Sequence, residues 1–288
     1  MNKLFVYYPM AASVDVDGLK VLLRERNVPL LEDKNAGDGI YIDKDSRAVE
    51  TVEETIRRKY ENSFFRFEII EVQKNDIGKF KQYKLNLNTV REGKDIEIPV
   101  KNHPCGNYMC PYGQTFDNLV YTSAKGLNAD LHEVTIIPRN EEYLLISERV
   151  RVLFEDNRIT GLAYSEVEVK HRDKIKQTVY IAEIQNHIIP VASSVKIGKL
   201  GLNCTLHNTV YDDALFGGVR EIDFGDSDFN TISAVAIKKV VYNLTTPRFT
   251  VSSKALLILT QNDIKGLLTK NSFSKNTYTP FTFGVEFI

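Results

Sequence analysis

Residues 142–161, EYLLISERVRVLFEDNRITG, decide the fold that this chain is expected to adopt. The apolar run at 143–146 predicts a strand. Ser147 follows and predicts a helix start, because its hydroxyl can accept a hydrogen bond from the first helical turn. The apolar side chains of the next turns recur at helical spacing, which predicts one buried helix face. Asn157 is expected to end the helix in the left-handed conformation, and Gly161 follows it.

A weaker copy of this stretch lies at residues 247–266, PRFTVSSKALLILTQNDIKG. Between 147–162 and 252–267 five positions are identical, and they are a Ser, an Asn, an Ile, a Gly and a Leu. They fall where a helix is capped, where it stops and where the chain re-enters the core. The sequence therefore predicts a weak internal repeat, 142–170 with 247–270, that forms two related strand–helix–strand halves.

Short alternating apolar runs dominate the rest of the chain, which predicts an α+β fold with mostly antiparallel sheets and a few helices. Runs at 83–87 and 96–100 flank turn residues and predict a hairpin. Residues 233–242 and the tail 278–288 predict further strands.

A charged stretch at 171–176 is the expected boundary between two parts of the chain. The predicted domains are an N-terminal α+β half, residues 1–172, and a C-terminal α+β half, residues 173–288.

The composition is that of an ordinary globular protein, with 43% apolar and 26% charged residues among 288. A net charge of −1 argues against a general nucleic-acid binder. Three cysteines, an odd number in a long chain, fit a reducing compartment. No apolar run is long enough to cross a bilayer, so the expected location is the cytoplasm.

A zinc site is the first chemical hypothesis. Cys105 and Cys110 lie in one loop, and Cys204 and His207 lie three residues apart in the second half. Four such ligands suit tetrahedral zinc. The spacing between the first two is loose, however, and buried free thiols explain the cysteines as well. The expectation is no cofactor, with zinc as the open alternative.

A magnesium-dependent nuclease site is the second hypothesis. Glu166, Glu168 and Lys170 lie on one face of a predicted strand after Asp156. An acidic residue followed by Glu-x-Lys on a strand is an arrangement with which nucleases hold magnesium and position water. An exposed strand face with alternating charge explains the pattern equally well.

An acidic region is the candidate partner-binding surface. Residues 201–230 carry six acids and one base, a net −5, whereas residues 238–275 carry +6. The acidic region could recognise a basic partner and speed its encounter, or it could be a solvated loop. The candidate contact residues are Asp212, Asp213, Glu221, Asp223, Asp226 and Asp228.

The segment LLISERV at 144–150, followed by NRITGL at 157–162 and VEV at 167–169, resembles bacterial immunity proteins of polymorphic and contact-dependent toxin systems. The similarity is greatest to the double-CxxCG group, in which a Cys loop precedes such a unit. Residues 105–113 would occupy that loop, although the first spacing here is Cys-x4-Cys and the second half keeps one Cys. The resemblance implies a non-enzymatic cytoplasmic protein that binds and blocks a cognate toxin.

The leading hypothesis is therefore an immunity protein that occludes a toxin, with no catalytic residues and no nucleic-acid or membrane partner. No Gly-x-Ser-x-Gly, His-Glu-x-x-His or Walker pattern occurs in the sequence. The alternatives are a metal-dependent nuclease or hydrolase that uses Asp156, Glu168 and Lys170, and a structural or phage assembly protein.

Overall fold

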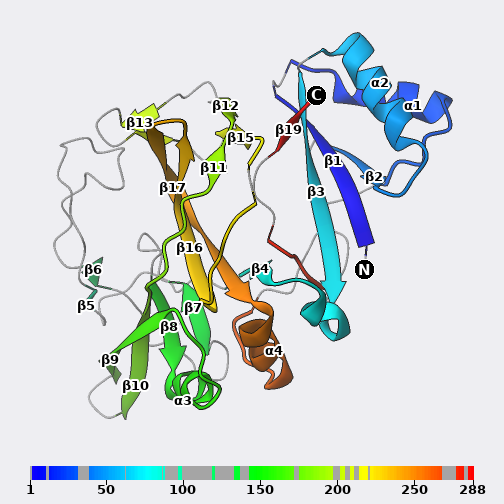
Figure 1. Ribbon diagram of the computed structural model, residues 1–288. Coiled ribbons are helices and arrows are strands. Elements are labelled where there is room, and N and C mark those ends of the chain that lie inside the picture. The colour runs from blue at the N-terminus through cyan, green and yellow to red at the C-terminus, as the bar shows by residue number, and fades with distance from the viewer. Residues whose placement is uncertain are drawn as a thin grey trace.

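The computed structural model describes residues 2–10, 13–31, 39–61, 63–85, 87, 97–98, 119–120, 133–136, 143–171, 175–196, 202–204, 208–210, 214–219, 221–267, 277–281 and 285–288. It combines helices with several mostly antiparallel sheets, which confirms the α+β prediction (Figure 1). The helices are α1 (Val16–Glu25), α2 (Val49–Lys59), the 3-10 helix η1 (Lys74–Lys79), α3 (Glu148–Asp156) and α4 (Ser253–Gln261). The strands are β1 (Asn2–Pro9), β2 (Ile40–Asp43), β3 (Phe64–Gln73), β4 (Gln82–Lys84), β5 (Glu97–Ile98), β6 (Leu119–Val120), β7 (Val134–Ile136), β8 (Tyr143–Ser147), β9 (Leu162–His171), β10 (Ile175–Ile184), β11 (Val191–Ala192), β12 (Ser194–Lys196), β13 (Leu202–Cys204), β14 (Thr209–Val210), β15 (Leu215–Gly217), β16 (Phe229–Ile237), β17 (Val240–Ser252), β18 (Thr277–Tyr278) and β19 (Glu286–Phe287).

The N-terminal sheet has the order β18-β3-β1-β2, and β19 also pairs with β3. Helices α1 and α2 lie together against this sheet (Figure 1). Asp15 caps the start of α1, because its carboxylate accepts the Gly18 N–H at 2.8 Å. The last residue belongs to the same core, since the Ile288 N–H donates to Phe64 O at 3.0 Å. Segments from both ends of the sequence thus complete one sheet.

The rest of the described chain contains two further large sheets, β7-β8-β10-β9 and β11-β16-β17-β14-β13, with β4 added to β17. Helix α3 follows β8, and α4 follows β17 (Figure 1). The structure therefore shows the strand–helix order predicted at both copies of the repeat. We name the repeated parts unit A (residues 133–136, 143–162 and 179–184) and unit B (residues 82–85, 87, 228–231 and 249–267).

The two helices begin and end alike. Ser147 caps α3 by accepting the Val150 N–H, and Ser252 caps α4 by accepting the Ala255 N–H. The C-cap is an asparagine in both, but its φ is −93° in each case. The left-handed residue is the next one along, Arg158 at φ 51° and Asp263 at φ 50°. The prediction that the asparagine itself takes this conformation was wrong by one position.

Serine-to-alanine substitutions at the two caps are expected to differ in cost. Ser147→Ala removes one capping hydrogen bond and should lower the free energy of unfolding by about 1 kcal/mol. Ser252→Ala should cost about 2 kcal/mol, because this hydroxyl also donates to the buried carboxylate of Asp228. Urea denaturation checks both values, and equal losses would contradict the second role of Ser252.

The third strand of each unit comes from a different side in the sequence: it follows the helix in unit A and precedes it in unit B. In unit A, Ser147 pairs with Val179 of β10, which follows α3 in the sequence. In unit B, Ser252 pairs with Gln82 of β4, which lies far upstream. Five residues further on, Ile184 pairs with Leu162 in unit A, and Leu87 forms an isolated bridge with Leu267 in unit B. The repeat therefore extends to a strand that its sequence alignment does not include.

This interleaving corrects the predicted domain boundary. A cut between 172 and 173 would pass between β9 and β10, which pair along their whole length from His171 and Ile175 to Leu162 and Ile184. The strand at 82–84 also crosses from the predicted N-terminal half into a sheet of the C-terminal half. The predicted halves share sheets and are not separate domains.

Three smaller expectations also need correction. The run at 83–87 does not form a hairpin with 96–100: β4 pairs with β17, and β5 pairs with β6. The predicted strand at 233–242 spans the turn between β16 and β17. The tail contributes two short strands, β18 and β19, in place of one.

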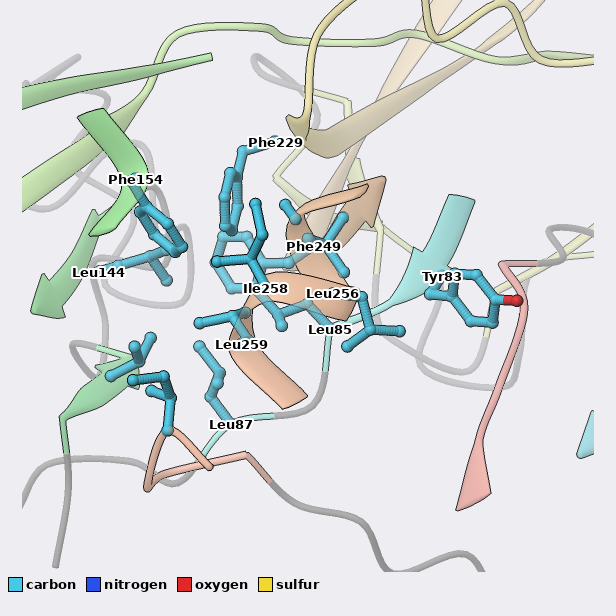
Figure 2. Close-up of a cluster of buried hydrophobic side chains, with 14 of the residues drawn as sticks. Tyr83, Leu85, Leu87, Leu144, Phe154, Phe229, Phe249, Leu256, Ile258 and Leu259 are labelled. Atoms are coloured by element: carbon cyan, nitrogen blue, oxygen red, sulfur yellow. The ribbon is translucent and has the colours of Figure 1, made fainter. Parts of the chain in front are cut away.

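Units A and B bury their apolar faces in one shared core (Figure 2). Phe154 of α3 packs against Phe229 of β16, with ring centroids 5.4 Å apart. Leu259 occupies in α4 the position that Phe154 has in α3, and both side chains are fully buried. Paired positions of this kind from the two units include Leu144 with Phe249, Ile146 with Val251, Val150 with Ala255, Ala182 with Leu85 and Ile184 with Leu87.

Each unit also inserts a glycine against the first strand of the other. A Cβ on Gly161 would lie 2.5 Å from Phe229 O, and one on Gly266 would lie 2.0 Å from Val134 O. Phe229 and Val134 are equivalent, since they pair with Val251 and Ile146. The contacts between the units are thus reciprocal, as in a two-fold symmetric dimer formed within one chain.

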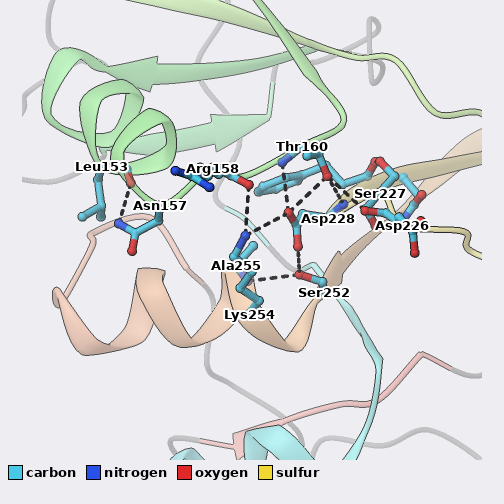
Figure 3. A network of polar contacts seen from close by, with 12 residues as sticks. Leu153, Asn157, Arg158, Thr160, Asp226, Ser227, Asp228, Ser252, Lys254 and Ala255 are labelled. Atoms are coloured by element: carbon cyan, nitrogen blue, oxygen red, sulfur yellow. Dashed lines mark hydrogen bonds and ion pairs between the residues drawn. The ribbon is translucent and has the colours of Figure 1, made fainter.

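Buried acids complete these crossed contacts. Asp228 of unit B accepts the Thr160 N–H of unit A at 3.0 Å (Figure 3). Glu133 of unit A accepts the Lys265 N–H of unit B at 3.1 Å. Both acids are buried, with 7% and 6% of their surface exposed. Each acid therefore binds the segment that follows the helix of the other unit.

Candidate binding groove

A groove of about 510 Å³ lies between two extended segments of the chain, residues 186–191 and 221–225. At one end of the groove, strands β12 and β15 pair, and the Ser193 N–H donates to Gly217 O at 3.0 Å. Beyond this pairing the two segments separate. At the other end, the Asn186 side chain bonds to Asn230 of β16. The groove is thus an opening between two segments whose continuations, β12 and β15, pair with each other.

One wall is the edge of the sheet that contains β16. Segment 186–191 runs parallel to β16, where the Ile188 N–H donates to Thr231 O and the Ala236 N–H donates to Pro190 O, both at 2.8 Å. Along this wall two apolar side chains are exposed, Ile189 at 49% and Val191 at 42%. An exposed apolar row on a sheet edge is unusual, because edges are normally protected by charge.

The other wall is acidic. Glu221 and Asp223 are exposed and alternate with the half-buried Ile222 and Phe224. The Asp223 carboxylate accepts the Gly225 N–H at 2.9 Å through one oxygen. Among the residues that the structure describes, those that line the groove include these two carboxylates and His187 but no lysine or arginine. The arrangement suits a ligand that carries both positive charge and apolar groups.

The structure divides the predicted partner-binding acids. Glu221 and Asp223 lie in the groove wall, and Asp226 is exposed beside it. Asp212 and Asp213 lie outside the described residues.

Asp228 must be removed from that set. The residue is 7% exposed, and its carboxylate accepts hydrogen bonds from Thr160 and Ser252 (Figure 3). The Lys254 Nζ lies 3.9 Å from it. Asp228 directly precedes β16, whose first residues are buried, so its side chain is buried too. There it bonds to Thr160 of unit A and Ser252 of unit B and so links the two units.

The zinc hypothesis falls largely outside the described residues. Cys105, Cys110 and His207 are not among them, and only the backbone of Cys204 is described, in β13. Within the described ranges, no group of three or more His, Cys, Asp and Glu is placed to hold a metal ion.

The nuclease hypothesis receives no support from the described part of its site. Asp156 and Glu166 are exposed, and the side chains of Glu168 and Lys170 lie outside the described residues. In the same region, hydrogen bonding to Arg151 lowers the pKa of the Glu148 carboxyl to about 2. A carboxyl that acts as a general acid needs a pKa raised toward neutrality. The pKa of Glu148 is lowered instead, because its ion pair with Arg151 stabilises the charged form.

The sequence reasoning missed the wall at 186–191. Its signal was present, since Ile189 and Val191 flank Pro190, a residue that belongs at sheet edges and not in central strands. The acidic residues opposite were found, but no local pattern shows that the two segments face each other. That pairing depends on β12 and β15, which are brought together by long-range contacts.

No family model, no curated protein and no solved structure matches this chain. Among the described helices, none is long and apolar enough to span a membrane.

Proposed function

We propose that this chain is a binding protein that neutralises a cognate bacterial toxin by covering the toxin's functional surface. The observation that carries the proposal is the groove: an open sheet edge with exposed apolar side chains faces a wall that bears Glu221 and Asp223. Such a surface attracts a basic partner over a distance and offers it an apolar contact at close range.

The interior of the protein supports the same function. Two units interlock through a common apolar core and reciprocal backbone contacts, and the buried acids Glu133 and Asp228 serve as fasteners between them. Occlusion needs a scaffold that keeps its surface in one shape, because a preorganised surface loses less entropy on binding. The resemblance of residues 144–169 to immunity proteins points to the same class.

The test takes the protein encoded by the reading frame beside this gene as the candidate toxin, expresses it in an inactive form and captures it on a biosensor. The double variant Glu221→Lys with Asp223→Lys should slow association by about tenfold or more, since loss of electrostatic steering acts mainly on the association rate. It should also fail to protect cells that express the active toxin. Glu25→Lys with Glu61→Lys makes the same charge change at two exposed positions, in α1 and just after α2, and should leave association unchanged.

Two results would count against the proposal in different ways. If no neighbouring toxin binds the protein or is neutralised by it, the function is wrong. If the toxin binds and the double variant associates at the normal rate, the function stands and the contact surface lies elsewhere.

A further inference from the structure

At the groove edge, some main-chain hydrogen-bonding groups have no backbone partner among the described residues. In a parallel pair, alternate residues of a strand turn their N–H and C=O groups toward the neighbour and away from it. Asn186, Ile188 and Pro190 bond toward β16, so His187, Ile189 and Val191 turn outward. In the part of the chain that the structure describes, no backbone hydrogen bond occupies the groups of His187 or Ile189.

Pro190 leaves this outer edge intact. A proline normally blocks a sheet edge because it lacks an N–H donor. Here its carbonyl accepts from Ala236, so the position that lacks a donor faces the paired side. The outward donors at positions 189 and 191 are therefore retained, and among the described strands none pairs with this side of the edge.

The side chains indicate what that strand carries. Ile189 and Val191 offer an exposed apolar row, and the facing wall presents Glu221 and Asp223, with no basic residue in the described part of the lining. A segment in extended conformation alternates its side chains between two faces. One with apolar residues at every second position and lysine or arginine between them would match both walls.

We propose that the groove binds an extended basic segment of the partner protein, which adds as a β-strand to the edge at residues 187–191 while its cationic side chains pair with Glu221 and Asp223. This inference rests on the proposed function and names the part of the toxin that is recognised. Strand addition supplies affinity through the main chain, and the acidic wall supplies selectivity for charge.

The experiment uses short synthetic peptides, so it does not require the toxin. A fluorescent peptide of alternating lysine and valine should bind the full chain, and a glutamate–valine peptide should not. Binding of the lysine peptide should weaken about tenfold or more in Glu221→Lys with Asp223→Lys, and also when alternate peptide amides are N-methylated. Glu25→Lys with Glu61→Lys serves as the charge-matched control. Hydrogen exchange at the amides of Ile189 and Val191 should slow when the peptide is bound.

Several outcomes would overturn strand addition: equal binding of the glutamate peptide, equal binding of the N-methylated peptide, or unchanged exchange at both amides. Ile189→Lys gives a second check, because a lysine on the edge repels the basic segment and should abolish binding. If the toxin is captured while the lysine peptide fails to bind, this inference is wrong and the proposed function stands. If the peptide binds as described and no neighbouring toxin is captured, the groove assignment stands and the proposed function is wrong.

Discussion

Gly266→Ala is expected to abolish stable folding or to lower the free energy of unfolding by about 4 kcal/mol. The residue has a φ of 113°. Its new Cβ would lie 2.0 Å from Val134 O, a main-chain atom that cannot rotate away. Left-handed strain costs about 1–2 kcal/mol and a forced backbone shift about 1–3 kcal/mol. Gly161→Ala should behave similarly, since its Cβ would lie 2.5 Å from Phe229 O at a φ of 88°.

Substitutions at two other glycines distinguish the cost of the positive φ from the cost of the clash with a main-chain atom. Gly225 has a φ of 57° and no atom of a described residue within 4 Å of a new Cβ, so Gly225→Ala should lose only the strain, about 1 kcal/mol. Gly78 also has open space and does not have a positive φ, so Gly78→Ala should be nearly neutral. Urea denaturation of the four variants gives the comparison. If Gly266→Ala and Gly225→Ala lose the same amount, the two units do not pack as closely as described.

Asp228→Ala is expected to cost about 3 kcal/mol, because it leaves the Thr160 N–H and the Ser252 hydroxyl without their buried acceptor. Glu133→Ala should cost a similar amount, since it removes the acceptor of the Lys265 N–H and the partner of Arg149, 2.8 Å away. Thermal and urea unfolding measure both.

Asp228→Asn is the matched control for the first substitution. It keeps an oxygen that can accept a hydrogen bond and nearly the same shape, so it should lose less than half as much as Asp228→Ala. The electrostatic contribution from Lys254 is small at 3.9 Å and on an exposed side chain, so Lys254→Ala should cost well under about 1 kcal/mol. A loss from Lys254→Ala as large as that from Asp228→Ala would show that charge pairing dominates over hydrogen bonding here.

The parts of the fold that local chemistry specifies were predictable. Ser147 and Ser252 start helices because their hydroxyls satisfy a free N–H of the first turn. The glycines at 161 and 266 were recognised as matched positions, and the structure shows why no side chain fits there. Cap and stop residues act within a few positions of themselves, so their signals survive in a single sequence.

The turn between β16 and β17 shows where local signals fail. Lys238 takes a φ of 54°, a conformation that glycine and asparagine favour. Because neither residue is present at this turn, the sequence pattern predicts a single continuous strand here.

The candidate site was half predictable for a related reason. Glu221 and Asp223 were recognised by charge, but their position opposite Ile189 and Val191 depends on contacts between distant segments. In the sequence, nothing distinguishes Asp228 from the exposed acids near it. Only the strand pairing shows that Asp228 is equivalent to Glu133 of the other unit and is therefore a buried structural residue.

The upstream origin of β4 has a consequence for synthesis on the ribosome. Unit A obtains its strands from a short span, whereas residues 82–85 and 87 must wait for β17 and Leu267 before they find partners. Over that interval the nascent chain presents Tyr83, Leu85 and Leu87 to water, which favours capture by a chaperone that binds apolar segments. Co-translational folding should therefore proceed in two stages, with the second delayed until α4 has emerged.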